Sequence, residues 1–469
     1  MNRRLFVTKL GLLTGWLALS FDAYPFKLKR REKITGYVKN GNKGLLGVAV
    51  TDGYTITLTD YDGNYSFTAH PDATFVFIST PAGYDFLTKN NLATSYHKLE
   101  SRKTYDFNLK KLSKNDSKHQ FIIWADPQVK NKNDVAQMMA TSVPDVKQYL
   151  ASIPKGTLIH GISVGDLVWD DLSFFKDYNE AVSQMGIPFH QVLGNHDMNY
   201  NRGGDETSDQ TFKEFYGPTY YSFNRGKAHY IILDDVRYLG KDRQYDGYIS
   251  KEQLNWIKND LLNVSKDSLI IVSLHIPVHN SVKNNTELYA ILSEFKNVHI
   301  MSGHTHNNTN TEKNGVYEHT HGTVCGAWWT GPICEDGAPR GYGIYEVDGT
   351  ELKWHYKSTG FNSSHQISLN LDNINNKKQF IANVWNWDPQ WKVEYFLDNK
   401  YMGLLENQKA YDPLAVKLYK GKDLPASRGF AEPKLNMHMF ASQFGPEINH
   451  VKVIATDRFG TKYEASANF

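Results

Sequence analysis

The sequence is poor in cysteine and has no excess of either charge. Cys325 and Cys334 are its two cysteines among 469 residues, which does not match a paired-CxxC zinc site. The two thiols could form a disulfide in an oxidising compartment or stay reduced in the cytosol, and the sequence leaves both open. Lysine plus arginine (52) nearly balance aspartate plus glutamate (50), so the charge implies no nucleic-acid partner.

Long hydrophobic runs are also missing. The apolar run from Leu10 to Leu19 is too short to cross a bilayer, and no later segment is apolar enough to do so. Arg3 and Arg4 precede this run in the layout of a signal peptide, either of the twin-arginine type or of the general type. Cleavage near Ala23 would assign residues 1–23 to the signal peptide. We therefore expect a periplasmic or otherwise exported protein.

Two missing patterns narrow the class further. No His-Glu-x-x-His sequence occurs, which argues against a zinc protease. The pair Trp387-Asp388 has no periodic partners along the chain, so the sequence does not support a propeller.

The rest of the chain divides into three segments with different hydrophobic patterns. Residues 33–112 contain short strand-like runs between Gly and Asp turn signals, which predict a small β-sandwich. Residues 118–360 alternate strand-like and helix-like segments, as in a layered α/β domain. From residue 366 to residue 469 the β pattern returns. The alternating Trp385, Trp387 and Trp391 are expected in the core of this C-terminal β-rich domain rather than on a sugar-binding surface.

Polar clusters follow the predicted strands of the central domain. In open α/β sheets, ligands bind beyond the carboxyl ends of the strands, so these clusters are expected to meet at one rim. The clusters are Asp126-Pro-Gln128, Gly165-Asp166, Gly194-Asn-His-Asp197, His275 and Gly303-His-Thr-His306.

The residue types in these clusters suit a site for two metal ions. A carboxylate such as that of Asp166 has two oxygens and can bridge two cations, while imidazole nitrogens and an amide oxygen complete the ligand set. Two cations about 3.5–4 Å apart would clamp a phosphate and lower the pKa of a shared water. Each cluster alone is weak evidence, but all five in this order favour a metal site.

The ordered set resembles the calcineurin-like metallophosphoesterases, which carry D-x-H, GD, GNH[D/E], H and GHxH in the same order. The resemblance covers about residues 120–358 and implies an αββα sandwich core. The three-part layout is similar to an exported bacterial branch with a transthyretin-like N-terminal domain and a separate C-terminal domain. The fold expected is therefore a calcineurin-like core flanked by two small all-β sandwich domains.

The resemblance also implies a role for each residue. The first metal would take Asp126, Gln128, Asp166 and His306, and the second would take Asp166, Asn195, His275 and His304. His196 matches the family's catalytic histidine near the leaving group, and Asp197 would orient it. The implied activity is hydrolysis of a small phosphomonoester or phosphodiester by a metal-bridged hydroxide. The alternative is a degenerate core that binds an envelope component or a glycan.

Two positions depart from common patterns of the family. Gln128 stands where histidine is usual, and its neutral amide oxygen suits manganese better than zinc, although zinc, magnesium or iron stay open. Trp169 stands where purple acid phosphatases carry an iron-binding tyrosine, which disfavours an iron(III)–tyrosinate site. Gln128 could also mark a weakened site.

Other residues near the last motif are candidates with weaker support. Trp328, Trp329 and Arg340 could line the substrate site, with Arg340 meeting a phosphate. Structural roles are expected for three further histidines, namely His279, His319 and His321. The natural substrate, the choice between monoester and diester, and the oligomeric state are left open by the sequence.

Overall fold

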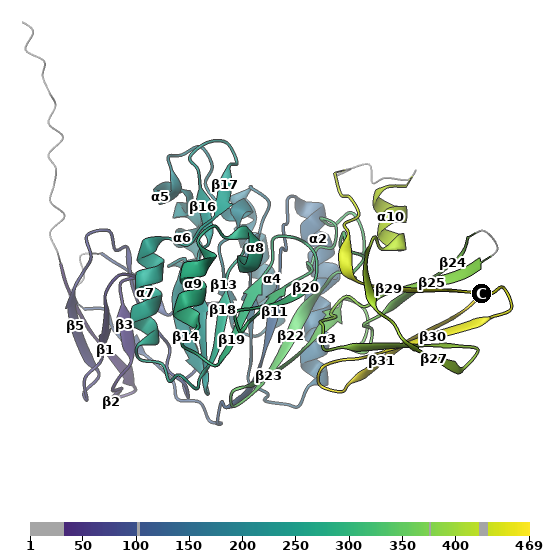
Figure 1. The fold of residues 1–469 in the computed structure, drawn as a ribbon. Coiled ribbons are helices and arrows are strands. Elements are labelled where there is room, and N and C mark those ends of the chain that lie inside the picture. The colour runs from purple at the N-terminus through teal and green to yellow at the C-terminus, as the bar shows by residue number, and fades with distance from the viewer. Residues whose placement is uncertain (1–31, 101–103, 375–376, 422–429) are drawn as a thin grey trace, which may run out of the picture.

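The computed structural model describes residues 32–100, 104–374, 377–421 and 430–469. The expected signal segment, with Arg3, Arg4, the run from Leu10 to Leu19 and Ala23, lies outside the described residues. Within the described part, no helix is long and apolar enough to cross a membrane. The chain forms three parts in a row, with the N-terminal strands at one end and the C-terminal strands at the other (Figure 1).

The central part is a sandwich of two sheets. The first sheet has seven strands in the order β23-β22-β11-β12-β13-β8-β7, and the second has six in the order β14-β15-β18-β19-β21-β20. The strands of the first sheet are β7 (Thr88–Lys89), β8 (Leu92–Ala93), β11 (Lys118–Trp124), β12 (Ile159–Ser163), β13 (Phe189–Gln191), β22 (Gly341–Asp348) and β23 (Glu351–Ser358). Those of the second are β14 (Tyr221–Arg225), β15 (Ala228–Ile232), β18 (Leu269–Ser273), β19 (Asn297–Ser302), β20 (Thr309–Lys313) and β21 (Val316–Thr320).

Strand alternation explains how each sheet is buried on both faces. Along β11, Phe121 and Ile123 belong to the core between the two sheets, whereas Ile122 and Trp124 belong to the core under the helices. Helices α2 (Lys132–Ala140), α3 (Ser142–Ser152) and α4 (Phe175–Met185) contribute to the outer core, as do α7 (Lys251–Leu261) and α9 (Asn285–Leu292). This arrangement confirms the expected αββα core.

The N-terminal part is a small β-sandwich. One sheet contains β1 (Lys33–Asn40), β2 (Lys43–Gly44), β5 (Asn64–Thr68) and β10 (Phe107–Asn108). The other contains β3 (Ala49–Thr51), β4 (Ile56–Leu58), β6 (Phe75–Ile78) and β9 (Tyr96–Lys98). Strands β7 and β8 lie within this segment of the sequence but belong to the first sheet of the central part, because Leu92 of β8 pairs with Phe189 of β13.

The C-terminal part is a second β-sandwich. One sheet contains β24 (Ser368–Ile374), β25 (Lys377–Asn383), β28 (Asn407–Ala410) and β29 (Asn436–Phe444). The other contains β26 (Lys392–Leu397), β27 (Lys400–Leu404), β30 (His450–Thr456) and β31 (Lys462–Asn468). Trp391 is buried in the core of this sandwich and Trp387 packs against it, as expected. Trp385 is also buried, but in a separate cluster with Cys334, Ala338 and Tyr356 and not in the sandwich core.

Candidate active site

The predicted metal ligands follow strand ends in both sheets of the sandwich. In the first sheet, β11, β12 and β13 run parallel, and Asp126, Asp166 and Asn195 follow their carboxyl ends. In the second, β18 and β19 run parallel, and His275 and His304 follow them. Parallel strands bring these turns to one rim.

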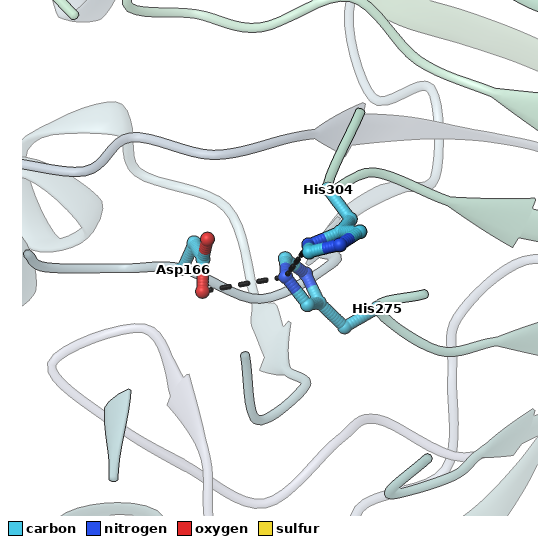
Figure 2. A group of neighbouring side chains, drawn as sticks. All are labelled: Asp166, His275 and His304. Atoms are coloured by element: carbon cyan, nitrogen blue, oxygen red, sulfur yellow. Dashed lines mark hydrogen bonds and ion pairs between the residues drawn. The ribbon is translucent and has the colours of Figure 1, made fainter. Parts of the chain in front are cut away.

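A tight group of donor atoms surrounds His275. Its Nε2 lies 3.3 Å from Asp166 Oδ1, 3.0 Å from Asn195 Oδ1 and 3.2 Å from His304 Nδ1. Figure 2 shows three of these side chains pointing toward one another. The ligand atoms of Asp166, His275 and His304 all lie within 4.8 Å of one another, a grouping that can hold a metal ion.

A second group of donors adjoins the other oxygen of Asp166. Gln128 Nε2 donates to Asp166 Oδ2 at 2.7 Å. His306 Nε2 lies 3.5 Å from Asp126 Oδ1, whose carboxylate also accepts the backbone N–H of His304. Asp166 therefore stands between the two groups of donor atoms.

Two buried atoms show that a cation fits this arrangement. Gln128 Oε1 and His306 Nδ1 are buried and accept or donate no hydrogen bond within the described part of the chain. Buried polar atoms of this kind cost about 1–3 kcal/mol when they stay unpaired. With Asp126, Asp166 and Asn195 nearby, the Gln128 amide and the His306 imidazole belong to a set of oxygen and nitrogen donors suited to divalent cations.

The backbone of the ligand turns is unusual. The φ angles are positive at Asp126 (48°), Gln128 (39°), Asp166 (52°), His304 (68°) and His306 (58°). Non-glycine residues in this region cost about 1–3 kcal/mol each and persist where the surrounding structure enforces them. Such strain gathers at functional sites, and here it falls on five of the seven predicted metal ligands.

Electrostatics keep Asp166 ionised at the centre of the site. Burial disfavours its charge, but attraction to His275 and His196 lowers the pKa of Asp166 below its usual value. Burial likewise opposes protonation of His275, yet the adjacent Asp166 raises the pKa of His275 to about 10. Burial and the neighbouring His275 lower the pKa of His304 to about 3. The carboxylates therefore favour positive charge at this point.

His196 lies at the rim, and its partner differs from the sequence-based expectation. Its Nδ1 is 2.7 Å from Asp170 Oδ1, while Asp170 Oδ2 lies 2.6 Å from Arg243 Nη2. Burial opposes a charge on the ring, but Asp166 and the hydrogen-bonded Asp170 raise the pKa of His196. His196 is thus favoured in its protonated form.

The expectation that Asp197 orients His196 is wrong. The Asp197 carboxylate accepts backbone N–H groups from Gly194, Leu167 and Val168, at 2.9, 3.1 and 3.1 Å. It therefore joins the turn after β12 to the turn after β13. Asp170 holds the imidazole instead, because its loop passes beside the ring.

A pocket of about 190 Å³ opens onto these residues. Trp328 lines it, as expected, and its ring lies 4.5 Å from that of His306. The other two expected lining residues do not. Trp329 is buried and its Nε1 donates to Pro127 O at 2.8 Å, while Arg340 lines a different cleft and donates to Gly331 O.

Several pocket residues were not anticipated from the sequence. Tyr245 comes from β17 (Tyr245–Gly247), which pairs with β16 (Val236–Tyr238), and its ring lies 5.8 Å from that of His304. Phe430 and Lys434 come from the C-terminal part of the chain. Lys434 Nζ forms an ion pair of 2.8 Å with Glu335. The acidic pair Asp170-Asp171 after the Gly-Asp motif was a usable signal for Asp170, but nothing in the sequence indicated Phe430.

The three further histidines considered from the sequence and the two cysteines do not line this pocket. His279 contacts Glu318 at 3.1 Å, His319 contacts His299 at 3.0 Å and His321 contacts Tyr345 at 2.7 Å. Cys325 and Cys334 are both free and buried.

Three protein-family models match the chain. The N terminal of Calcineurin-like phosphoesterase matches residues 32–112, Calcineurin-like phosphoesterase matches residues 142–308, and the C terminal of Calcineurin-like phosphoesterase matches residues 318–463. Together they account for most of the sequence, in the order of the three parts described above.

Curated relatives match parts of the chain. A Psychrobacter arcticus protein named "Probable cyclic nucleotide phosphodiesterase" is 27% identical over 193 residues, which span 38% of this chain and 67% of that protein. A Fibrobacter succinogenes protein named in the same way is 27% identical over 137 residues, 27% of this chain and 48% of that protein. The chain therefore spans about half to two thirds of these relatives.

Solved structures were also compared. A dimetal phosphatase from Danio rerio has a TM-score of 0.36 and 14% identity, covering 51% of this chain and 97% of its own. A purple acid phosphatase from yellow lupin has a TM-score of 0.39 and 12% identity, covering 70% of each chain. On the three family matches, the chain belongs to the calcineurin-like phosphoesterase family, and it is a metal-dependent phosphoesterase.

Proposed function

We propose that the protein hydrolyses small phosphodiesters with two divalent cations held on either side of Asp166. The observation that carries the proposal is the pair of donor groups that share this carboxylate. His275 approaches Asp166 Oδ1 and Gln128 approaches Asp166 Oδ2, so each oxygen faces a different group. Divalent cations held by these two groups would supply a water of lowered pKa and would neutralise phosphate charge.

The seven side chains divide into two ligand sets. Asp126, Gln128 and His306 would hold one cation together with Asp166, and Asn195, His275 and His304 would hold the other. The amide oxygen of Gln128 favours a hard ion such as manganese over zinc. Gln128 Oε1 is buried without a hydrogen-bond partner in the described residues, which supports a role of Gln128 as a metal ligand.

His196 supplies the proton for the departing oxygen in this proposal. Although burial opposes the charge, Asp166 and Asp170 raise the pKa of His196, which favours the protonated ring, and the ring lines the pocket beside Asp166. Asp170 accepts the hydrogen bond from Nδ1, which leaves Nε2 as the nitrogen that can donate. Arg243 holds the second oxygen of Asp170 and so fixes the carboxylate.

The charge around the pocket favours a diester over a monoester. A monoester brings two negative charges near neutral pH and a diester brings one. Lys434 is the one lysine or arginine among the described residues that line the pocket, and Glu335 already neutralises it. The names of the curated relatives point in the same direction.

The test is a substrate comparison on manganese-loaded protein. Bis(p-nitrophenyl) phosphate should be hydrolysed with a higher kcat/KM than p-nitrophenyl phosphate, and Asp166→Asn should remove nearly all turnover. A preference for the monoester would overturn the diester assignment. No hydrolysis of either ester by protein that holds two metals would overturn the enzymatic function and leave a binding role.

We also propose that the protein is exported. The support is the sequence alone, namely Arg3, Arg4 and the apolar run that follows them. Localisation of a C-terminally tagged full-length protein in cell fractions tests this, and a cytoplasmic product of unchanged length would contradict it.

A further inference from the structure

Three aromatic rings meet at the rim of the metal pocket. Trp169 and Trp328 have ring centroids 6.2 Å apart, Trp169 and Phe430 are 5.5 Å apart, and Trp328 and Phe430 are 4.9 Å apart. All three side chains line the same pocket as Asp166 and His196. We refer to these three rings as the aromatic wall.

Two rings of the aromatic wall lie beside predicted active-site histidines. The Trp328 ring lies 4.5 Å from that of His306, a predicted metal ligand, at an interplanar angle of 31°. The Trp169 ring lies 5.6 Å from that of His196, the predicted proton donor, at 64°. A substrate whose phosphate sits between these histidines would therefore lay one of its ester groups on the aromatic wall.

The outer end of the aromatic wall comes from a different part of the chain. Phe430 lies beyond the central sandwich in the sequence, and 51% of its surface is exposed. Two described residues near Phe430 in the sequence contact the central part: Tyr419 donates to Ile333 O at 2.7 Å, and Lys434 pairs with Glu335 at 2.8 Å. The C-terminal part thus completes the pocket rather than only flanking it.

The arrangement of the rings indicates what they bind. A cage for a quaternary ammonium needs rings that enclose the cation, each with its face within about 6 Å of it. Here Phe430 meets Trp169 and Trp328 edge to face, at 79° and 69°, and the two tryptophan rings are tilted by 45° to each other. Lys130 Nζ already lies 4.5 Å over Trp169. The rings form a continuous apolar surface on which a flat group can pack.

We propose that the aromatic wall binds a planar, base-like group joined to the phosphate, which makes nucleotides the substrate class. This inference rests on the proposed phosphodiesterase function. Stacking on aromatic side chains accepts any base, because every base has a π-face. An aliphatic ester group could also cover apolar surface, but it would gain no stacking, and the experiment below separates the two.

The experiment measures binding rather than turnover. Manganese-loaded, full-length protein is titrated calorimetrically with adenosine 5′-monophosphate, ribose 5-phosphate and hexyl phosphate, which share a phosphate and differ in the attached group. Wild type should bind the adenosine compound on the order of 10-fold more tightly than either other probe, within the range of base stacking. Phe430→Ala should reduce this preference several-fold.

Tyr401→Ala is the matched control. Tyr401 lies on β27 and 52% of its surface is exposed, but it does not line the pocket, so this change should leave the preference intact. Equal binding of adenosine 5′-monophosphate and ribose 5-phosphate by wild type would overturn the inference, as would hexyl phosphate binding as tightly as the adenosine compound. An unchanged preference in Phe430→Ala would remove Phe430 from the site.

Hydrolysis of bis(p-nitrophenyl) phosphate by the same preparations separates this inference from the function on which it rests. Hydrolysis without a base preference contradicts the aromatic wall alone. A base preference without hydrolysis contradicts the phosphodiesterase function and leaves the nucleotide site standing.

Discussion

At the scale of single residues, the site depends on which carboxylate meets which imidazole. His196 carries a raised pKa because Asp166 lies nearby and Asp170 accepts its hydrogen bond. Asp170 has a φ of 62°, so its backbone is strained in the conformation that presents the carboxylate. Asp197, although it follows His196 directly in the sequence, holds three backbone N–H groups instead.

Asp170→Asn should lower the pKa of His196, because it removes the negative charge that stabilises the imidazolium. A proton donor acts only while protonated, so the fall of kcat/KM on the alkaline side should move to lower pH, by about 1 unit or more. A pH profile with bis(p-nitrophenyl) phosphate measures this shift. The neighbouring Asp171→Asn is the control, since Asp171 caps the short helix η1 (Leu172–Phe174) and should leave the profile in place. An unmoved profile in Asp170→Asn would show that Asp170 does not act on His196.

Gln128→His should shift metal preference from manganese toward zinc. Imidazole nitrogen is a better ligand for zinc than an amide oxygen is, and Gln128 Oε1 is already buried and unpartnered within the described structure. Competition between the two ions, followed by elemental analysis, gives the ratio of affinities. A ratio identical to that of wild type would place Gln128 outside the ligand set.

At the scale of elements, the site is built from turns that pack directly on one another. The turn after β13 reaches the turn after β12 at Gly194, where an added Cβ would lie 2.0 Å from Asp166 N and 2.3 Å from Asp166 Oδ1. Contacts this short require the turns to separate, since real Cβ atoms do not approach other atoms so closely. The glycine is therefore needed for the bridging carboxylate to stand where both donor groups reach it.

Gly194→Ala should accordingly lose bound metal as well as stability. Gly349→Ala provides the comparison, because Gly349 joins β22 to β23 at a φ of 65° with open space around its Cβ position. That change should cost about 1 kcal/mol of stability and leave metal content unchanged. Elemental analysis and urea unfolding of both variants test the difference. Full metal content in Gly194→Ala would refute the close packing of the two turns.

At the scale of the whole molecule, the core between the two sheets contains neutral histidines. His190 stacks on Phe223 with ring centroids 3.8 Å apart, and both of its ring nitrogens are buried without a partner in the described structure. Burial lowers the pKa of His190 to about 3. Below about pH 6.5, His190 therefore takes up a proton in the unfolded chain but stays neutral in the folded protein. The free energy of unfolding falls as the pH drops from about 6.5 toward 3.

His190→Phe should be more stable than wild type in acid, by a margin that grows as the pH falls. The expected gain between pH 6.5 and pH 5 is about 1.5 kcal/mol, because the slope rises from about half to nearly all of 1.4 kcal/mol for each pH unit. Urea unfolding of both proteins at the two pH values measures it, and comparison with wild type cancels the titration of other groups. A margin independent of pH would mean that His190 is not held neutral.

Much of the fold could be predicted from the sequence pattern, whereas part of the candidate site could not. A layered α/β domain was predictable because its strands are continuous apolar runs with polar residues directly after them, and the resemblance of the ordered motifs implied its αββα arrangement. The positions brought together at the rim were predictable for the same reason. The acidic pair Asp170-Asp171 was a signal for a carboxylate near the site, but the one that reaches His196 was not predictable, because side-chain direction depends on the left-handed backbone at Asp170. Phe430 was not either, because its contact with Trp328 depends on how two domains pack, and neither local sequence encodes that packing.

The central claim is that the seven side chains gathered about Asp166 hold two catalytic cations. The most direct measurement is the number of manganese ions per chain, by elemental analysis, together with bis(p-nitrophenyl) phosphate hydrolysis on the same sample. The account predicts two ions per wild-type chain, with turnover appearing as the second ion binds. It predicts at most one ion and almost no turnover in Asp166→Asn, because an amide cannot bridge two cations. Two ions and full activity in Asp166→Asn, or an active wild type with a single ion, would contradict it.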